Sequence, residues 1–405
     1  MSSTPDDKKP PSKRQQRQAA EATQIYTTPP TSKDVVFLAR ELILCTLPHS
    51  NPGNVLSWSR TNGNLTLGIV SGVNVKIGIP YGIPYGIIPR LILIWMVTEI
   101  IRTKSRRLEL GNRLADFLLK LGLNASNGTG KRSDARRVRE QLERLLHATI
   151  SFNYSLKGEG RRGYGWQNME ISPDGVLWWS DKDPDQTALF GSWIEVGEKF
   201  FDAVMNAPHP LDIRVVQHVK DSSLGIDLYT ILNREAYRAM RDDKPRFLAW
   251  EWLLEQTGNE YSDIRDFRRR SLIQIKAIME VHSGLFIKFQ HGHRGQKSGI
   301  LISNLSTPSI PIKMAREPVK SAADRTPPAL ALVPPPAPPP ERFLKPTTVA
   351  KFRGLYPRLD PYACKDDFDA WAAGLPPEKK PRFYDAAFMG FAEKWVVGKL
   401  IVSNP

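Results

Sequence analysis

The chain is poor in cysteine, with only Cys45 and Cys364 among 405 residues. Two cysteines so far apart in the sequence do not form a disulfide framework, and they are typical of a protein in a reducing compartment. The first 20 residues are polar and charged and have no apolar core, so we expect no signal peptide. Together these absences predict a cytoplasmic protein.

Long hydrophobic runs are missing as well. The most apolar stretch, Ile87–Ile101, is interrupted by one proline and two charged residues. It is too short and too charged to span a bilayer, which takes about 20 consecutive apolar residues. We therefore expect this stretch to be a buried helix, and we expect no membrane partner.

Signatures of catalytic sites are scarce. Residues 128–131, Gly-Thr-Gly-Lys, resemble the end of a P-loop, but Ala125 stands where that loop needs glycine and Arg132 where it needs serine or threonine. His291 and His293 are spaced like metal ligands, yet no cysteine or carboxylate-rich cluster accompanies them in the sequence. Gly-x-Ser-x-Gly and Cys-x-x-Cys motifs do not occur in the chain. We expect a binding protein, not an enzyme, with no catalytic residues, no metal and no cofactor.

What the chain does have is positive charge. Lysine and arginine outnumber aspartate and glutamate by 57 to 42, which gives a formal net charge of +15. Such an excess favours a polyanionic partner, most often nucleic acid.

Residues 133–147 combine this charge with helical periodicity. Val138, Leu142, Leu145 and Leu146 fall on one face of the predicted helix. The residues on or beside the opposite face are Ser133, Arg136, Arg137, Glu140, Arg144 and His147. A helix that packs on one side and presents arginines on the other suits insertion into a DNA groove, although most basic helix faces are simply solvated.

The neighbours of this helix favour DNA contact. A helix over Glu109–Leu121 precedes it, and a β-hairpin with strands over 148–156 and 165–171 follows, with a third strand at 175–180. The cationic residues of the loop before the helix and of the hairpin tip include Lys131, Arg132, Arg161 and Arg162. Helix, helix, basic helix and a hairpin with a cationic tip is the order of a winged helix, in which the wing is a second DNA-contacting element.

The same order recurs downstream. The predicted elements are helices over 213–219, 224–241, 250–257 and about 261–282, and strands over 285–290 and 299–304. The apolar stripe of the long helix is Ile264, Phe267, Ile275, Ile278 and Met279. Arg268 falls near that stripe, which favours a structural role for it. The cations that point away from the stripe are Arg265, Arg269, Arg270 and Lys276. The sequence therefore predicts an α+β fold with two winged-helix domains in tandem, residues 33–190 and 191–305.

Three further segments complete the predicted organisation. They are a disordered basic tail (1–32), a Pro-rich linker (306–345) and a small helical C-terminal module (346–405). Inside the first domain we expect a helix over 35–45 and a hairpin with strands over 55–59 and 65–70, turning at Asn62-Gly63. In the C-terminal module, Phe388, Phe391 and Trp395 share one helical face. The module is either a segment that docks a partner or a helical cap on its own chain.

A series of short motifs extends this interpretation. In chain order it comprises Tyr85–Leu91, Thr103–Ser105, Leu110-Gly111, Phe117, Leu121-Gly122 and Gln141-x-x-Arg144-Leu145. The series resembles the RepA family of plasmid-encoded replication initiators from Gram-negative bacteria, over about Ile79–Ile310. Residues 351–357 and 384–388 resemble an extension found on some members, and the doubled Ile-Pro-Tyr-Gly at 79–86 departs from the pattern.

The resemblance implies a function. Members of this kind bind repeated sites (iterons) at a plasmid origin, open an adjacent AT-rich region, and recruit the host initiator and the replicative helicase. In the wider class of iteron-binding initiators, the C-terminal winged helix reads the major groove, and the N-terminal one contacts the DNA backbone or forms a homodimer. By this resemblance Arg265, Arg269 and Arg270 would read base edges, and Arg294 and Lys297 would contact phosphate.

The candidate DNA-binding residues form two sets, one for each predicted winged helix. The complete set is Arg265, Arg269, Arg270, Lys276, Arg294, Lys297, Lys131, Arg132, Ser133, Arg136, Arg137, Arg144, Arg161 and Arg162. Three alternatives to an initiator stay open at this point: a winged-helix repressor, of its own gene among others; an interaction scaffold whose charge serves solubility; and a covalent relaxase.

Overall fold

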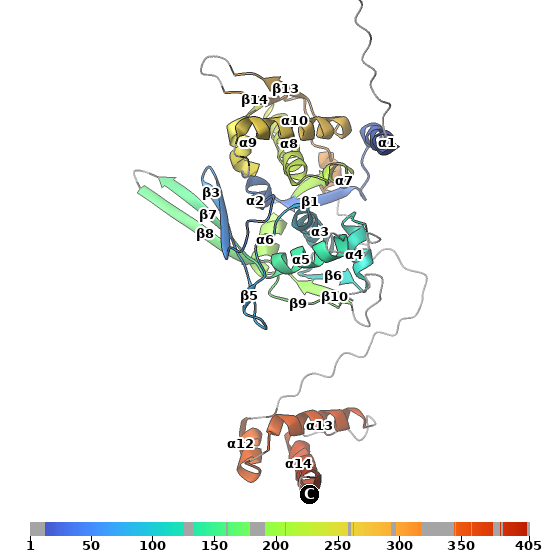
Figure 1. The fold of residues 1–405 in the computed structure, drawn as a ribbon, viewed down its shortest axis with the longest axis vertical. Helices are drawn as coiled ribbons and strands as arrows, with labels where there is room; N and C mark the ends of the chain where they lie inside the picture. Colours follow the sequence, from blue (N-terminus) through green and yellow to red (C-terminus); the bar gives the residue numbers. More distant parts are fainter. Residues whose placement is uncertain are drawn as a thin grey trace, which may run out of the picture. The chain divides into compact units, whose positions relative to one another are not determined.

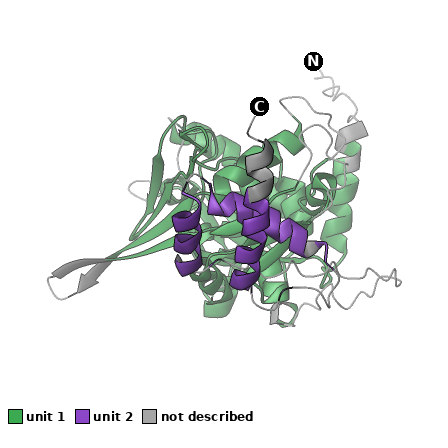
Figure 2. Ribbon diagram, turned by 90° about the horizontal axis from the view of Figure 1, so that it is seen from below, with its two compact units in different colours: residues 1–324 green, residues 325–405 purple. Residues whose placement is uncertain are grey.

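The structure is a computed structural model of the chain. It describes residues 13–124, 133–316, 344 and 346–402, apart from 159–160, 179–190, 207, 258–260, 262, 293–296, 358, 376–380 and 382–383. The chain divides into two compact units, residues 1–324 and 325–405, which are coloured separately in Figure 2. Unit 1 combines helices with small antiparallel sheets, as expected for the α+β class, and the described part of unit 2 is helical.

Unit 1 begins with a helix and a group of short elements. They are α1 (Lys13–Thr27), β1 (Val35–Ala39), α2 (Arg40–Leu44), β2 (Ser57–Asn62), β3 (Leu65–Val70), β4 (Val73–Asn74) and β5 (Ile79–Pro80). Residues 13–27 were expected to be disordered, and this expectation was wrong. The apolar side of α1 explains why: Ala22 is buried and Ile25 packs against the core.

Two sets of elements with a shared order follow (Figure 1). The first repeat contains α3 (Ile87–Thr103), β6 (Arg107–Gly111), α4 (Leu114–Lys120), α5 (Asp134–Leu146), β7 (Thr149–Gly158), β8 (Arg161–Glu170), β9 (Asp174–Val176) and β10 (Ser192–Glu195). The connection contains α6 (Glu198–Asn206), β11 (Pro208–Asp212) and α7 (Ile213–Val219). The second repeat contains α8 (Ser223–Asp242), β12 (Arg246–Ala249), α9 (Trp250–Thr257), α10 (Ile264–Val281), β13 (Ile287–Gln290) and β14 (Gly299–Ile302), and the short helix α11 (Ile312–Arg316) comes after it.

The sheets of the two repeats have the same topology. Their strand orders are β6-β10-β9 and β12-β14-β13, so in each repeat the last strand lies in the middle. In each repeat the first strand of the sheet is followed by two helices, and an antiparallel pair of strands then completes the sheet. The first repeat differs by the long β7–β8 hairpin, which is inserted between its third helix and that pair. Strand β12, which supplies the first edge of the second sheet, was missed by the sequence analysis.

The β7–β8 hairpin belongs to another sheet than expected. It was predicted to be joined by a third strand at 175–180, but β9 pairs with β10, and the hairpin extends a sheet of order β2-β3-β7-β8. The pairing aligns Leu67 with Phe152 and Ile69 with Ile150, and all four side chains are buried. Burial of these apolar pairs stabilises the larger sheet and removes the hairpin from the position of a wing in the first repeat.

Two predicted helices contain strands. Residues 35–39 of the helix expected over 35–45 form β1, which pairs with β11 and is buried at every position. Residues 107–111 form β6, where Leu108 and Leu110 alternate inward, so the helix expected from Glu109 begins only at Leu114. A short apolar run buried on both faces has no periodicity that separates strand from helix, which explains the first error.

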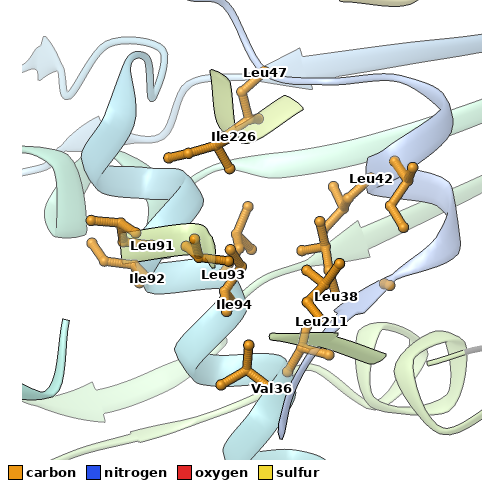
Figure 3. Close-up of a cluster of buried hydrophobic side chains, with 14 of the residues drawn as sticks. Val36, Leu38, Leu42, Leu47, Leu91, Ile92, Leu93, Ile94, Leu211 and Ile226 are labelled. Atoms are coloured by element: carbon orange, nitrogen blue, oxygen red, sulfur yellow. The ribbon is translucent and has the colours of Figure 1, made fainter. Parts of the chain in front are cut away.

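The core of unit 1 is centred on α3. The apolar stretch that was predicted to be a buried helix forms this element, and its side chains are buried all around the helix. Figure 3 shows Leu91, Ile92, Leu93 and Ile94 of α3 with apolar side chains that come from β1, α2, β11 and α8. The repeats therefore share one hydrophobic core and do not form two independent ones.

A buried ion pair joins the first helices of the two repeats. Arg90 of α3 donates from Nε and Nη2 to the two carboxylate oxygens of Asp227 of α8, at 2.7 and 2.8 Å. His49 lies 2.8 Å from the same carboxylate, and Arg90 also donates to the carbonyl of Leu47 at 2.6 Å. Burial raises the pKa of Asp227, but the Arg90 charge and the hydrogen bonds of Arg90 and His49 outweigh it, so the pKa lies well below its ordinary value.

Unit 2 has its own small core. Its helices are α12 (Pro346–Leu355), α13 (Pro361–Ala373) and α14 (Tyr384–Val402). Phe352, Phe368 and Phe388, one from each helix, are fully buried against one another. Phe391 and Trp395 pack on this core, which confirms that they share a face with Phe388. The three helices therefore have a packed interior that is separate from that of unit 1.

Candidate nucleic-acid interface

Helix α10 is oriented by its apolar stripe. Phe267, Ile275 and Ile278 are fully buried, and Ile264 and Met279 are partly buried against the core, which confirms the stripe predicted from the sequence. The carboxylate of Asp263 caps the N-terminus by accepting a hydrogen bond from the backbone N–H of Arg265 at 2.8 Å. Helix α10 packs on α1, α7, α8 and α9, and the side that these helices leave uncovered faces solvent.

The solvent side of α10 carries arginines. The side chains of Arg265, Arg269 and Arg270 are 90%, 66% and 56% exposed. Asp266 accepts hydrogen bonds from both Arg269, at 2.7 Å, and Arg270, at 3.0 Å. The bond from Arg269 is the main cause that lowers the pKa of this carboxyl. One acid thus holds two guanidinium groups side by side on an exposed helical face, with their remaining N–H groups available to a ligand.

The other residues of the second predicted set are exposed or lie outside the described residues. Lys276 is exposed on α10, and Lys297 is exposed just before β14. Arg294 lies outside the described residues. Arg268 donates to Nδ1 of His291 at 3.3 Å and lies over the Trp250 ring, so it ties α10 to the end of β13, as its place near the stripe indicated.

Helix α5 confirms its predicted apolar stripe but only part of its predicted basic face. Val138, Leu142, Leu145 and Leu146 are all buried. Arg136 and Arg137 are exposed, and Arg137 forms an ion pair with Asp134 at 3.2 Å. Lys131 and Arg132 lie outside the described residues, as do the side chains of Arg161 and Arg162, which belong to β8. Arg136 and Arg137 are therefore the described cations that α5 exposes to a ligand.

Ser133 and Arg144 do not belong to an exposed face, which corrects the prediction. Ser133 is buried and caps α5, where its hydroxyl accepts from the backbone N–H of Arg136 at 3.3 Å. The Arg144 side chain is only 15% exposed. It donates to the carbonyl of Ile83 at 3.2 Å and to Glu140 at 2.8 Å, and it lies over the Tyr85 ring. Arg144 is covered by the segment before α3, whereas the Ser133 hydroxyl is used within α5 as its cap.

The cap leads to a test. Replacing Ser133 with alanine should lower the free energy of unfolding by about 1 kcal/mol, because the cap hydrogen bond is lost. DNA affinity in folded protein should stay the same. Urea titration measures the first quantity and fluorescence anisotropy the second. Replacing Ser133 with aspartate should retain most of the stability, since aspartate also caps helices. A loss of affinity at unchanged stability would return Ser133 to the DNA-contacting set.

Sequence reasoning missed one residue of the α10 face. Ile273 is 56% exposed although it is a large apolar side chain. It follows Arg269 by four positions, so helical spacing could have placed it on the exposed side. It was missed because isoleucine is ordinarily assigned to a core.

Other kinds of site have less support in the structure. Among the described residues, no three or more His, Cys, Asp or Glu side chains are grouped so as to hold a metal ion. His293, half of the histidine pair, lies outside the described part. Cys45 and Cys364 are buried and free. None of the described helices combines the length and the apolar composition that crossing a membrane requires.

The fold and this surface define a class: an α+β protein with two topologically matching repeats, each of which exposes arginines on its third helix. Comparison of the sequence with known families is more specific. The family model described as plasmid-encoded RepA protein matches residues 83–254. This match confirms the resemblance seen in the motifs. The matched part runs through the first repeat to α9 and ends before α10.

Other comparisons give less. No curated protein matches the chain significantly. Two solved structures of domains 2 and 3 of RctB are similar to it. One, of selenomethionine derivatives, has a TM-score of 0.38 and 10% sequence identity, and the match covers 65% of this chain and 98% of that one. The other, of RctB residues 155–483, has a TM-score of 0.34 and 11% identity, over 65% of this chain and 95% of that one.

Proposed function

We propose that the protein is a sequence-specific double-stranded DNA-binding protein that initiates plasmid replication. It binds repeated sites (iterons) at the origin, promotes opening of the duplex, and recruits host replication proteins. It acts by binding and assembly, without catalysis and without a cofactor. The observation that carries this proposal is the exposed arginine face of α10, and the match of residues 83–254 to the family model of plasmid-encoded RepA proteins supports it.

In this proposal each repeat is a winged helix. This assignment is supported by the order of three helices and three strands that the repeats share, and by the central place of the last strand in both sheets. The third helices, α5 and α10, are then the recognition helices. In helix-turn-helix proteins the N-terminal residues of the recognition helix contact base edges. Arg265, Arg269 and Arg270 occupy the N-terminal half of α10, which suits them to this role.

The two repeats have different roles in the proposed DNA binding. In α10, a bidentate contact of each arginine with guanine would be worth about 1–3 kcal/mol of discrimination. In α5, the exposed cations are reduced to Arg136 and Arg137, so the first repeat contacts the DNA backbone or a second copy of the chain. Unit 2, with its own core and with Tyr362 and Trp371 exposed, is the part that we assign to docking a host initiator or helicase.

Footprinting on DNA that flanks the gene tests the proposal. We expect protection of several direct repeats spaced near whole helical turns. A single protected palindrome would favour the repressor, and binding without preference over bulk DNA would favour the scaffold. A 5′-phosphotyrosyl adduct formed on supercoiled plasmid would show a relaxase and contradict the proposal.

Lys297 allows a separate test of phosphate contact. Replacing it with alanine should weaken binding to all sequences alike and reduce the slope of log affinity against log salt concentration by about 1, because one fewer counterion is released. Anisotropy titrations at several salt concentrations measure the slope. Lys351 of α12, which is also exposed, is the matched control and should leave the slope unchanged on substitution with alanine. An unchanged slope for the Lys297 variant would remove it from the interface.

A further inference from the structure

The exposed face of α10 is not purely basic. Ile273 lies four positions after Arg269 and three before Lys276, and it is 56% exposed. A single exposed apolar side chain is common on protein surfaces, so exposure alone decides nothing. The position of Ile273 among the cations is what needs a physical reason.

The geometry of the helix excludes a packing role for Ile273. At 100° per residue, Arg265, Arg269 and Ile273 form one row along the helix, with neighbouring Cβ atoms about 5–6 Å apart. The buried residues Phe267 and Ile278 lie on the opposite side. Leu272 and Met279, which flank the row, pack on the core of unit 1, whereas Ile273 is not part of the described core. Its side chain therefore points where the arginines point.

The surface that fits this row is a base-pair edge in the major groove. The neighbouring cations favour a polyanion, and among the base edges of the major groove thymine alone presents a methyl group, at C5. Apolar side chains recognise that methyl, while arginine recognises the O6 and N7 atoms of guanine. An isoleucine next to arginine in the row therefore matches a thymine next to a guanine.

We propose that Ile273 is a specificity-determining residue that contacts the C5-methyl group of a thymine adjacent to the guanine bound by Arg269. This inference rests on the proposed function and adds to it the identity of one base. Because the contact removes one methyl group from water, its loss should weaken binding about three- to tenfold.

The test removes the methyl group from the DNA and the side chain from the protein. The probe is the duplex protected in footprinting, with each thymine replaced in turn by deoxyuridine, which lacks only the C5-methyl. The full-length protein should lose about three- to tenfold in affinity at one position, next to a guanine. Ile273→Ala should bind the thymine duplex about as weakly, and should not distinguish thymine from uracil at that position. Alanine is a good helix former, so α10 should remain folded.

A matched control comes from unit 2. Leu355 of α12 is 55% exposed, nearly the same as Ile273, and Leu355→Ala should keep the full response to uracil. The inference is overturned if the protein binds the site specifically but tolerates uracil at every position, or if Ile273→Ala keeps the wild-type response. Absence of any sequence-specific protection by the wild-type chain would instead contradict the proposed function itself.

Discussion

Replacing Arg269 and Arg270 together with glutamate should abolish sequence-specific protection of DNA. Each arginine that pairs with guanine contributes about 1–3 kcal/mol, so loss of two such contacts weakens binding by roughly 30-fold or more. The new carboxylates would also lie beside Asp266, which now holds both arginines, and three acids there would repel the phosphates. Footprinting and anisotropy on the wild-type site measure the effect.

The fold should survive this change, because both side chains are more than half exposed and neither belongs to the core. Circular dichroism and urea titration verify that. The matched control reverses two exposed cations near the end of α8, Arg241→Glu and Lys244→Glu, which changes the net charge by the same amount. An unchanged footprint with the α10 variant would contradict the assignment of α10 as the helix that reads bases. Arg136 and Arg137 of α5 would then be the candidates for that role.

Replacing Asp227 with alanine should lower the free energy of unfolding of unit 1 by about 3–5 kcal/mol. The change leaves Arg90 buried without its carboxylate, and a buried charge that has lost its partner costs that much. Arg90 would retain only carbonyl partners, among them that of Leu47 at 2.6 Å. Urea titration followed by tryptophan fluorescence measures the loss.

A second variant separates the ion pair from the packing. Replacing both partners with apolar residues, Arg90→Met and Asp227→Leu, should be less destabilising than Asp227→Ala alone, since no charge is then left buried. If the single variant loses less than about 1 kcal/mol, the ion pair does not hold the two repeats together in the way that its burial indicates.

Much of the fold could be predicted where the pattern is local. The apolar stripes of α5 and α10 repeat with the period of a helix over many residues, and the structure buries both stripes. The Asn62-Gly63 turn joins β2 and β3 for the same kind of reason, because it depends on the conformations of adjacent residues. The cap at Ser133 is also local, and a serine before Asp134 signals it, but the residue was assigned to the DNA-binding face instead.

The candidate site is less well determined by sequence. Arg136 and Arg144 both lie on the predicted basic face of α5, yet Arg136 is exposed and Arg144 bonds to Ile83 and lies over Tyr85. Nothing in the local pattern distinguishes them, because the difference comes from a segment more than 50 residues earlier in the chain. The same holds for Arg90, whose charge lies inside an apolar run. Its role is seen only in the tertiary structure, where it pairs with Asp227.

The sequence by itself determined that the chain carries two basic helices, each with one apolar side, and a family relationship over residues 83–254. Tertiary structure alone decided that β7 of the β7–β8 hairpin pairs with β3, that the repeats share one core, and that α10 keeps three exposed arginines while α5 keeps two. The physical reason is that periodicity sets which side of a helix is apolar. Whether another segment covers the polar side depends on long-range burial, which no local pattern contains.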